Sequence, residues 1–332
     1  MKLFIVAAGI LAGIFLSAMA AERKVPEPLS ESSYSDARQI GNLTDPVLRE
    51  VSGIAASRRR GDILWVINDG GNGSFLYAIS LDGGTRGVFN IKGIRNRDWE
   101  DLASFTMDGK AFLLIPDVGD NAARRRETVL YIVEEPVIPQ THTPVRGDLP
   151  VLRRIHFRYE DGPRDCEAVA VDNDAGAIFL LSKRDVSPRL YELPLATAEG
   201  AGPATARFLS EVTSIPVPSE EDLLEDPIFG RLRYQPTAMD IDPSGRVAVI
   251  LTYKHAYRYE RAPTETWKTA FSRPPQILKL PELKQAEALA FGYDGHTIFV
   301  TSERRPPEES RPAPLLRIDR ISDKIRIPPN AQ

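Results

Sequence analysis

The stretch DCEAVAVDNDAGAIFLLSKRD (Asp165–Asp185) shows the pattern that decides the fold. An acidic start leads into a small and apolar run, a turn of Asn, Asp and Gly follows, and a strongly apolar run then ends in charged residues. A third run, RLYELPL (Arg189–Leu195), comes next. Short apolar runs bounded by turn residues are typical of β-strands. The stretch therefore predicts a meander of antiparallel strands.

The same unit recurs along the chain. Its five copies begin at Ser52, Glu100, Glu167, Thr237 and Glu287. The segments expected as fourth strands are GVFNIKG, LRRIHFRY, ARFLSEV and QILKLP. A four-stranded repeat of roughly 40–50 residues indicates a propeller. We expect an all-β protein, a β-propeller with four-stranded blades around an axial channel. Five blades fit best, and six is the alternative because two intervals could hold a degenerate blade.

The two ends of the repeat region set the expected domain limits. A strand near Ala37–Leu43 is expected to pair with the last blade and remove its free edge. The stretch 211–235 is expected to be an insertion, either a loop or a short helix. We predict a flexible segment over 21–35, one propeller domain over 36–325 and a tail over 326–332.

The first twenty residues predict export. Lys2 precedes an apolar run, Leu3–Leu16, and small residues at 18 and 20 predict a signal peptide over 1–20. A membrane anchor is the alternative, although the run is short for a span. We expect a secreted or periplasmic monomer with no membrane span after cleavage. Lys and Arg total 42 against 46 Asp and Glu, and without a long basic block no nucleic-acid partner is expected. Cys166 stands alone, so no internal disulfide forms.

The residues that open the five copies predict a metal site. The first strand of a propeller blade lines the channel, so Glu100, Glu167 and Glu287 would meet on the axis beside Ser52 and Thr237. Carboxylates in a narrow channel repel one another unless a cation lies among them. Ca²⁺ suits this set, because it takes six to eight oxygen ligands. The alternative is a channel of polar groups hydrogen-bonded to water.

A second polar set falls at the ends of the second strands, which should share one mouth of the channel. As catalytic candidates it contains Asp69, Asp117, Lys183 and Arg184, and as substrate-binding candidates Asn68, Asp120, Asn121, Lys254, Glu303 and Arg304. Acids near a cation, ringed by Lys and Arg, suit an anionic substrate such as a phosphate ester. For each residue alone, turn chemistry and solvated charge is the simpler interpretation. In RNRDWEDLASF (Arg95–Phe105), Trp99 is expected to pack inside the sheet and Asp98 to support the metal ligands.

The order Ser, Glu, Glu, Thr, Glu on the first strands resembles the soluble calcium-activated nucleotidases (apyrases), five-bladed propellers with one axial Ca²⁺. The resemblance implies that the five opening residues form the metal shell. VIND (Val66–Asp69) looks like that family's acidic turn near substrate, and LLSKR (Leu180–Arg184) is similar to its basic strand end. The family's Asp-Asp-Arg turn is absent. The stretch 165–185 also looks like blades of the esterase-like phytase and SdiA-regulated propellers.

These patterns leave three functions open. The first is calcium-dependent hydrolysis of a phosphoric ester or anhydride, with Asp69 or Asp117 orienting water and Lys183, Arg184 or Lys254 offsetting charge. The second is a non-catalytic propeller that binds a small ligand or a cell-surface partner around a structural calcium. The third is a lactonase or carboxylic esterase that uses the same cation.

Overall fold

The computed structural model describes residues 33–321 except 142, 198–201 and 305–310. The strands of this part of the chain form four hydrogen-bonded sheets. The first sheet contains, in spatial order, β2 (Val51–Ala56), β3 (Ile63–Asn68), β4 (Phe75–Ser80), β5 (Thr85–Ile91) and β9 (Val145–Leu149). The second and largest sheet contains β6 (Ala103–Met107), β7 (Lys110–Asp117), β8 (Thr128–Glu134), β10 (Arg153–Tyr159), β14 (Ala204–Glu211), β13 (Arg189–Pro194), β12 (Ala177–Lys183) and β11 (Asp165–Asp172). The third sheet contains β15 (Pro236–Ile241), β16 (Val247–Thr252), β17 (His255–Glu260) and β18 (Gln276–Lys279), and the fourth contains β19 (Ala286–Phe291), β20 (Ile298–Ser302), β21 (Ala313–Ile318) and β1 (Arg38–Leu43).

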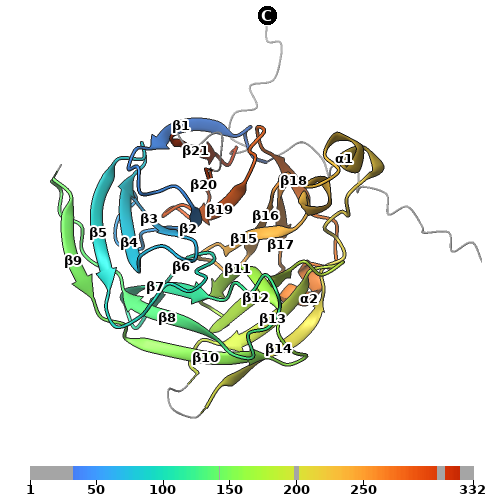
Figure 1. Cartoon of the computed structure of the whole chain (residues 1–332), viewed down its shortest axis with the longest axis horizontal. Coiled ribbons are helices and arrows are strands. Elements are labelled where there is room, and N and C mark those ends of the chain that lie inside the picture. The colour runs from blue at the N-terminus through green and yellow to red at the C-terminus, as the bar shows by residue number, and fades with distance from the viewer. Residues whose placement is uncertain (1–32, 142, 198–201, 305–310, 322–332) are drawn as a thin grey trace, which may run out of the picture.

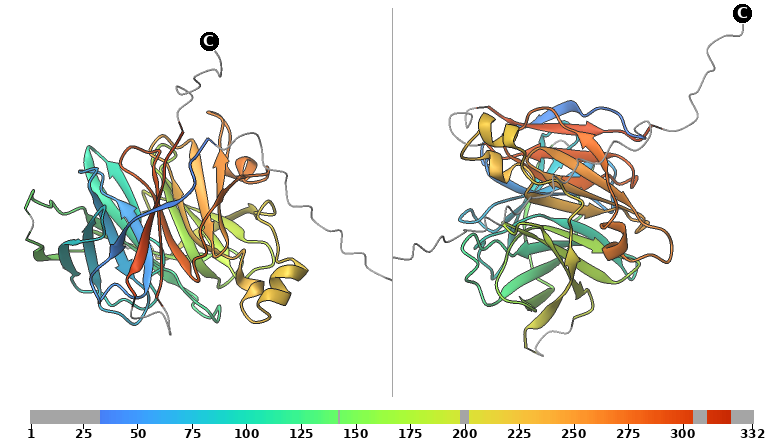
Figure 2. Two further views of the ribbon diagram at one scale, coloured as in Figure 1. Left: turned by 90° about the horizontal axis from the view of Figure 1, so that it is seen from above. Right: turned by 90° about the vertical axis from the view of Figure 1, so that its right-hand side faces the viewer.

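The sheets stand around a common centre, as a propeller requires (Figure 1). The first strand of each repeat lies innermost, and neighbouring inner strands contact one another around the ring: β2, β6, β11, β15, β19 and again β2. The largest sheet consists of two antiparallel meanders joined only where β10 pairs in parallel with β14. Side views show a disc whose strands cross its thickness (Figure 2). The chain is therefore all-β with a propeller-like arrangement.

The N-terminal strand closes the ring as the sequence predicts. β1 pairs antiparallel with β21, so the last repeat receives its outer strand from the opposite end of the chain. Two residues before the expected domain start at 36, Tyr34 is buried and forms an isolated bridge with Arg320. The predicted signal peptide, residues 1–20, and the predicted tail, 326–332, lie outside the described residues. Among the described residues, no helix has the length and apolarity that a membrane span needs.

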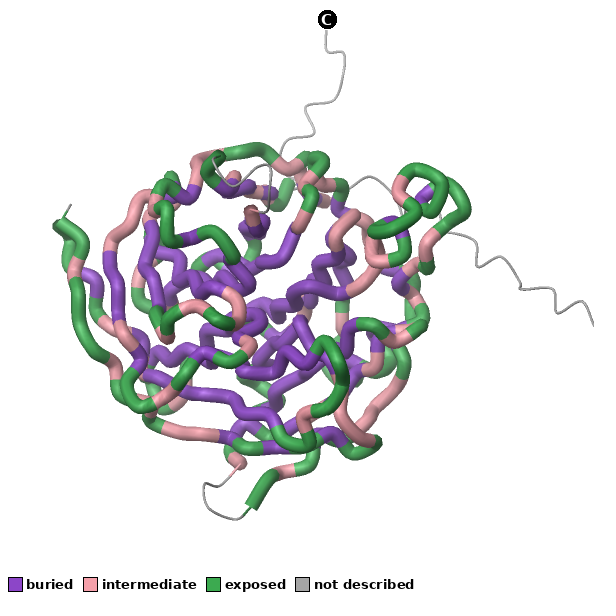
Figure 3. The backbone as a smooth tube through the Cα atoms, viewed as in Figure 1, coloured by how far each residue is buried: buried purple, intermediate pink, exposed green. Residues whose placement is uncertain are grey.

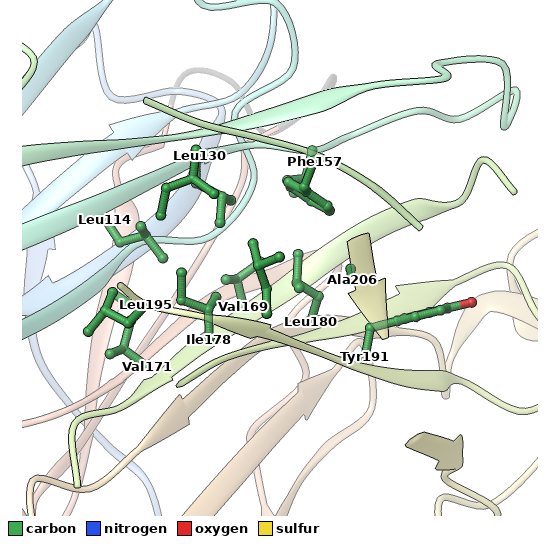
Figure 4. Close-up of a cluster of buried hydrophobic side chains, with 14 of the residues drawn as sticks. Leu114, Leu130, Phe157, Val169, Val171, Ile178, Leu180, Tyr191, Leu195 and Ala206 are labelled. Carbon is green, nitrogen blue, oxygen red and sulfur yellow. The ribbon is translucent and has the colours of Figure 1, made fainter. Parts of the chain in front are cut away.

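Apolar side chains fill the spaces between neighbouring repeats. Buried positions follow the inner and middle strands, and exposed positions gather in the loops and outer edges (Figure 3). One such layer is shown in Figure 4: Leu114 and Leu130 from β7 and β8 face Val169, Ile178 and Leu180 from β11 and β12, all buried. Truncating one such leucine to alanine costs about 2–5 kcal/mol. The packing fixes each repeat against the next, and this holds the inner strand ends in place.

The structure differs from the sequence predictions at two points. The strand β9 is not among the predicted strands; it adds in parallel to β5 as a fifth member of the first sheet. β6 begins at Ala103, so Glu100 precedes its strand rather than opening it. A short helix, α2 (Trp267–Ala270), follows β17, and the Trp267 side chain is buried. The insertion is a loop with helix α1 (Glu220–Glu225) and a 3₁₀ turn, η1 (Gly230–Leu232).

Candidate functional site

A β-bulge places four of the five predicted axial residues. In four inner strands the register skips one residue, and the skipped residues are Ser52, Glu167, Thr237 and Glu287. Glu100 lies between the bridge of Trp99 to Asp117 and the start of β6, and its amide donates to the Pro116 carbonyl (3.1 Å). A bulge bends a strand and redirects the side chain of its extra residue. The repeat therefore has a geometric basis: one polar residue leaves the ladder at the same end of each inner strand.

The two hydroxyl residues of this set tie neighbouring inner segments together. Ser52 Oγ donates to the carbonyl of Trp99 (2.8 Å), and Thr237 Oγ1 donates to the carbonyl of Ala286 (2.7 Å). Both side chains are buried. Their protons are thus used in holding the ring, which is a structural role that the sequence did not predict.

Two of the three glutamates share an internal cation. Lys183 Nζ contacts the Glu167 carboxylate and also donates to the hydroxyl of Tyr253 (2.7 Å). Tyr253 in turn donates to Glu287 Oε1 (2.8 Å). Burial disfavours the charge of Lys183, but Glu287 and Glu167 outweigh it and raise the pKa of the ammonium. This half of the axial set, which we call the ammonium half (Glu167, Lys183, Tyr253 and Glu287), carries its own counter-ion.

The third glutamate belongs to a separate acidic triad. One carboxylate oxygen from each of Asp69, Asp98 and Glu100 lies within 4.8 Å of the others. Burial, followed by the charge of Asp69, raises the pKa of Asp98 to about 6. Burial and the charges of Glu167 and Asp69 raise the pKa of Glu100 well above its usual range. Three oxygens that share so small a space favour a hard divalent cation.

The backbone around the triad leaves room for its carboxylates. A Cβ atom on Gly70 would lie 2.6 Å from Asp98 Oδ1, and one on Gly119 would lie 2.6 Å from Asp98 Cγ. Glycine at both positions therefore admits the Asp98 side chain between two loops. The Asp69 amide donates to the carbonyl of Glu50 (2.7 Å), which fixes the end of β3. The residues present fit an oxygen-coordinated cation, and the triad rather than the whole predicted ring supplies the closest oxygens.

Several predicted mouth residues are held in internal ion pairs. Asp117 is fully buried, with Arg125 Nη2 at 2.7 Å from Oδ1 and the Arg97 amide donating to Oδ2 (3.2 Å). Each oxygen of the Asp117 carboxylate thus has an internal partner, and the role of Asp117 in orienting water stays a prediction. Lys254 Nζ lies 2.5 Å from Asp222 Oδ1, so this lysine anchors helix α1 and does not join the axial set.

A second group of predicted residues lies around Asp165. Arg184 donates from Nε to Asp165 Oδ2 (2.5 Å) and contacts the Asn121 side chain. The other oxygen, Oδ1, accepts from the Asp120 amide (2.9 Å). The Arg184 side chain is 40% exposed, and the nearby Asp165 charge acts on Asp98. Arg184 thus lies at the rim of the mouth, on the side of the triad.

The remaining candidates contact the backbone that frames the mouth. Asn68 donates to the Val47 carbonyl (2.8 Å), and Arg304 donates to the Leu48 carbonyl (2.9 Å). Glu303 is buried and acts electrostatically on Tyr253. Sequence reasoning missed Tyr253 as a site residue. It occupies a strand end in TYKHAY, but only the fold shows that its hydroxyl joins two repeats.

Comparison with known proteins adds little to this geometry. No protein-family model matches the chain, and no curated protein matches it. Among solved structures, the chain is similar to a luciferin-regenerating enzyme at 11% sequence identity and a TM-score of 0.43, over 85% of this chain and 94% of that one.

Proposed function

We propose that this protein is an exported five-bladed propeller that binds Ca²⁺ at its axial mouth and hydrolyses a phosphoric ester or anhydride there. Five inner strands support the blade count: four have an equivalent bulge, and the fifth, β6, is preceded by Glu100. The β9 strand then counts as an addition to the first blade, and the eight-stranded sheet as two blades.

The acidic triad is the observation that carries this proposal. Asp69, Asp98 and Glu100 would hold the cation, because one carboxylate oxygen from each lies within 4.8 Å of the others. A bound divalent cation supplies a Lewis acid that polarises a phosphoryl oxygen and lowers the pKa of a coordinated water. Asp69, which is partly exposed, would accept a proton at its carboxylate. Arg184 would donate to an oxygen of the anionic substrate at the rim.

Calcium-dependent melting of the mature protein tests the site. The wild type should gain stability with added Ca²⁺, by about 2.7 kcal/mol at a hundredfold excess over the dissociation constant. Asp98→Asn and Glu100→Gln should lose this gain. Glu134→Gln is the matched control, because Glu134 is exposed and pairs with Arg59 far from the triad. A wild type that holds no Ca²⁺ and ignores chelator would end the proposal.

Turnover is measured next, on p-nitrophenyl phosphate and on nucleoside diphosphates and triphosphates, with Ca²⁺ or with EDTA. Activity should require Ca²⁺, and Arg184→Gln should reduce it by about tenfold or more, because a charge-assisted hydrogen bond to the substrate is lost. The melting gain should survive in Arg184→Gln. Substrate binding and cation binding are thereby separated.

One observation favours the binding propeller as a second candidate. Three of the predicted catalytic and binding groups already form internal ion pairs that stabilise the fold: Asp117, Lys254 and Lys183. A calcium-stabilised protein that turns over no phosphate ester, lactone or carboxylic ester would fit this function. Calcium would then act as a structural pin for a surface that binds a small ligand or a cell-surface partner.

A further inference from the structure

A cavity of about 410 Å³ lies at the opposite end of the strands from the axial mouth. The turn between β15 and β16 and the end of β17 form its walls, with Tyr34, His296 and Arg320 beside them. β15 starts near Thr237 at the mouth and runs to this turn, so the mouth end and the cavity end of this strand are roughly 16 Å apart. The cavity is therefore separate from the acidic triad.

Positive charge dominates the cavity wall. Its charged lining residues are Arg246, Arg258, Arg261, Arg320, Asp242 and Glu260, with His296 in addition. Asp242 is used within its own turn, where it accepts from the amides of Val247 (2.7 Å) and Arg246 (2.8 Å). Arg261 is balanced by Asp172 at 2.8 Å. Glu260 is then the one acid left against three arginines among the described lining residues.

These three arginines have unused donors. In the part of the chain that the structure describes, the guanidinium groups of Arg246 and Arg320 have no ion pair or hydrogen bond. Arg258 contacts Glu260 and Gln276, but its Nε is buried without a hydrogen-bond partner among the described residues. A buried donor without an acceptor costs about 1–3 kcal/mol, so an acceptor from a ligand would relieve it. The Glu260 side chain is 69% exposed and can turn toward solvent.

We propose that this cavity binds a small ligand that carries a phosphate group. The three arginines come from three elements: the β15–β16 turn, the strand β17 and the segment after β21. A tetrahedral phosphate accepts hydrogen bonds from several directions, whereas a carboxylate accepts along the edge of one plane. The volume suits a small molecule. This inference does not depend on the function of the axial mouth.

Calorimetric titration with inorganic phosphate tests the proposal at low ionic strength and in EDTA, which removes any contribution from a cation at the triad. Phosphate should bind the wild type at one site. The double variant Arg246→Gln, Arg320→Gln should bind about tenfold to a hundredfold more weakly. Both side chains lie at the surface of the cavity, so the variant should fold. Arg207→Gln is the matched control, because Arg207 is an exposed arginine paired with Glu192 elsewhere.

A gain of binding provides the opposite test. Glu260→Gln removes the acid that pairs with Arg258 in the wall and should tighten phosphate binding. Citrate in place of phosphate should bind more weakly to every variant. Absence of phosphate binding to the wild type, equal binding by the double variant, or weaker binding by Glu260→Gln would each overturn the proposal. The melting profile of each variant shows that it is folded.

Discussion

Asp101 lies at the centre of the ring and gives a sharp test of how the repeats are joined. Its Oδ2 accepts from the amides of Val169 (2.7 Å) and Met239 (3.0 Å), which belong to β11 and β15. Its Oδ1 accepts from the amide of Leu102 (2.9 Å). One fully buried side chain therefore connects three consecutive repeats. We expect Asp101→Ala to loosen these connections without touching the apolar layers.

The expected loss follows from the groups left unpaired. Each buried N–H without an acceptor costs about 1–3 kcal/mol, so the two amides of β11 and β15 together cost about 2–6 kcal/mol. Asp101 also has a positive φ of 63°, which disfavours alanine by a further ~1 kcal/mol or more. Burial raises the pKa of Asp101, which means that burying this acid costs free energy. Replacing it by alanine removes that cost, so the expected loss of stability lies toward the lower end of the range.

The matched control is Asp108→Ala. Asp108 has a similar φ of 50°, but it lies exposed in the turn between β6 and β7. This variant carries the same backbone penalty and leaves no buried amide unpaired. Urea unfolding followed by tryptophan fluorescence gives the free energy of unfolding for both variants. The free energy of unfolding of Asp101→Ala should be lower than that of Asp108→Ala by about 2–6 kcal/mol. A difference under about 1 kcal/mol would show that Asp101 does not hold the repeats together.

Three further predictions concern buried charge. Lys183→Met should destabilise the metal-free protein by about 3–5 kcal/mol, because it leaves a buried carboxylate unpaired. It should also tighten Ca²⁺ binding, because a competing positive charge beside the triad is removed. Weaker Ca²⁺ binding would contradict the division of the axial set. Arg125→Met should cost about 3–5 kcal/mol by leaving Asp117 unpaired, and adding Asp117→Leu should restore most of it in urea unfolding. Burial raises the pKa of Asp240 from 3.8 to about 6, so its stabilising contribution is complete below about pH 4 and is lost as the pH rises through 6. The stability difference between the wild type and Asp240→Asn should therefore fall by about 3 kcal/mol between pH 4 and pH 7, and a flat difference would show that Asp240 does not titrate there.

The repeat architecture could be predicted because its signals are local. Alternation of apolar residues, turn chemistry and a polar residue before each inner strand all lie within a few positions of one another. The closing strand β1 was predicted by the same reasoning, since a free edge at the last repeat needs a partner. β9 was missed because Val145–Leu149 reads VRGDL, which has little apolar character and pairs only along an edge.

The partners of individual charges could not be predicted, because they depend on distant segments. The sequence places Lys254 at the mouth, but in the structure its Nζ forms an ion pair with Asp222 of the 211–235 insertion. The sequence suggests that Asp117 is a catalytic acid, but in the structure Arg125, eight positions later in the chain, forms an ion pair with it. Both pairings require the loops to be placed in space first. Residue type and strand position identify the face on which a charge lies and leave its partner open.

The division of the axial set has a consequence for where chemistry can occur. Lys183 contacts Glu167 directly, whereas the carboxylates of Asp69, Asp98 and Glu100 gather at the triad, between the ends of β3 and β7. A cation held there would lie away from the ring centre. Arg184 lies on the same side, through its pairing with Asp165, whose charge acts on Asp98. An anionic ligand could then contact the cation with one oxygen and Arg184 with another. The asymmetry of the ring thus favours a one-sided site, in which Asp69, Asp98 and Glu100 supply the ligands and the charge of Lys183 tunes the affinity for the cation.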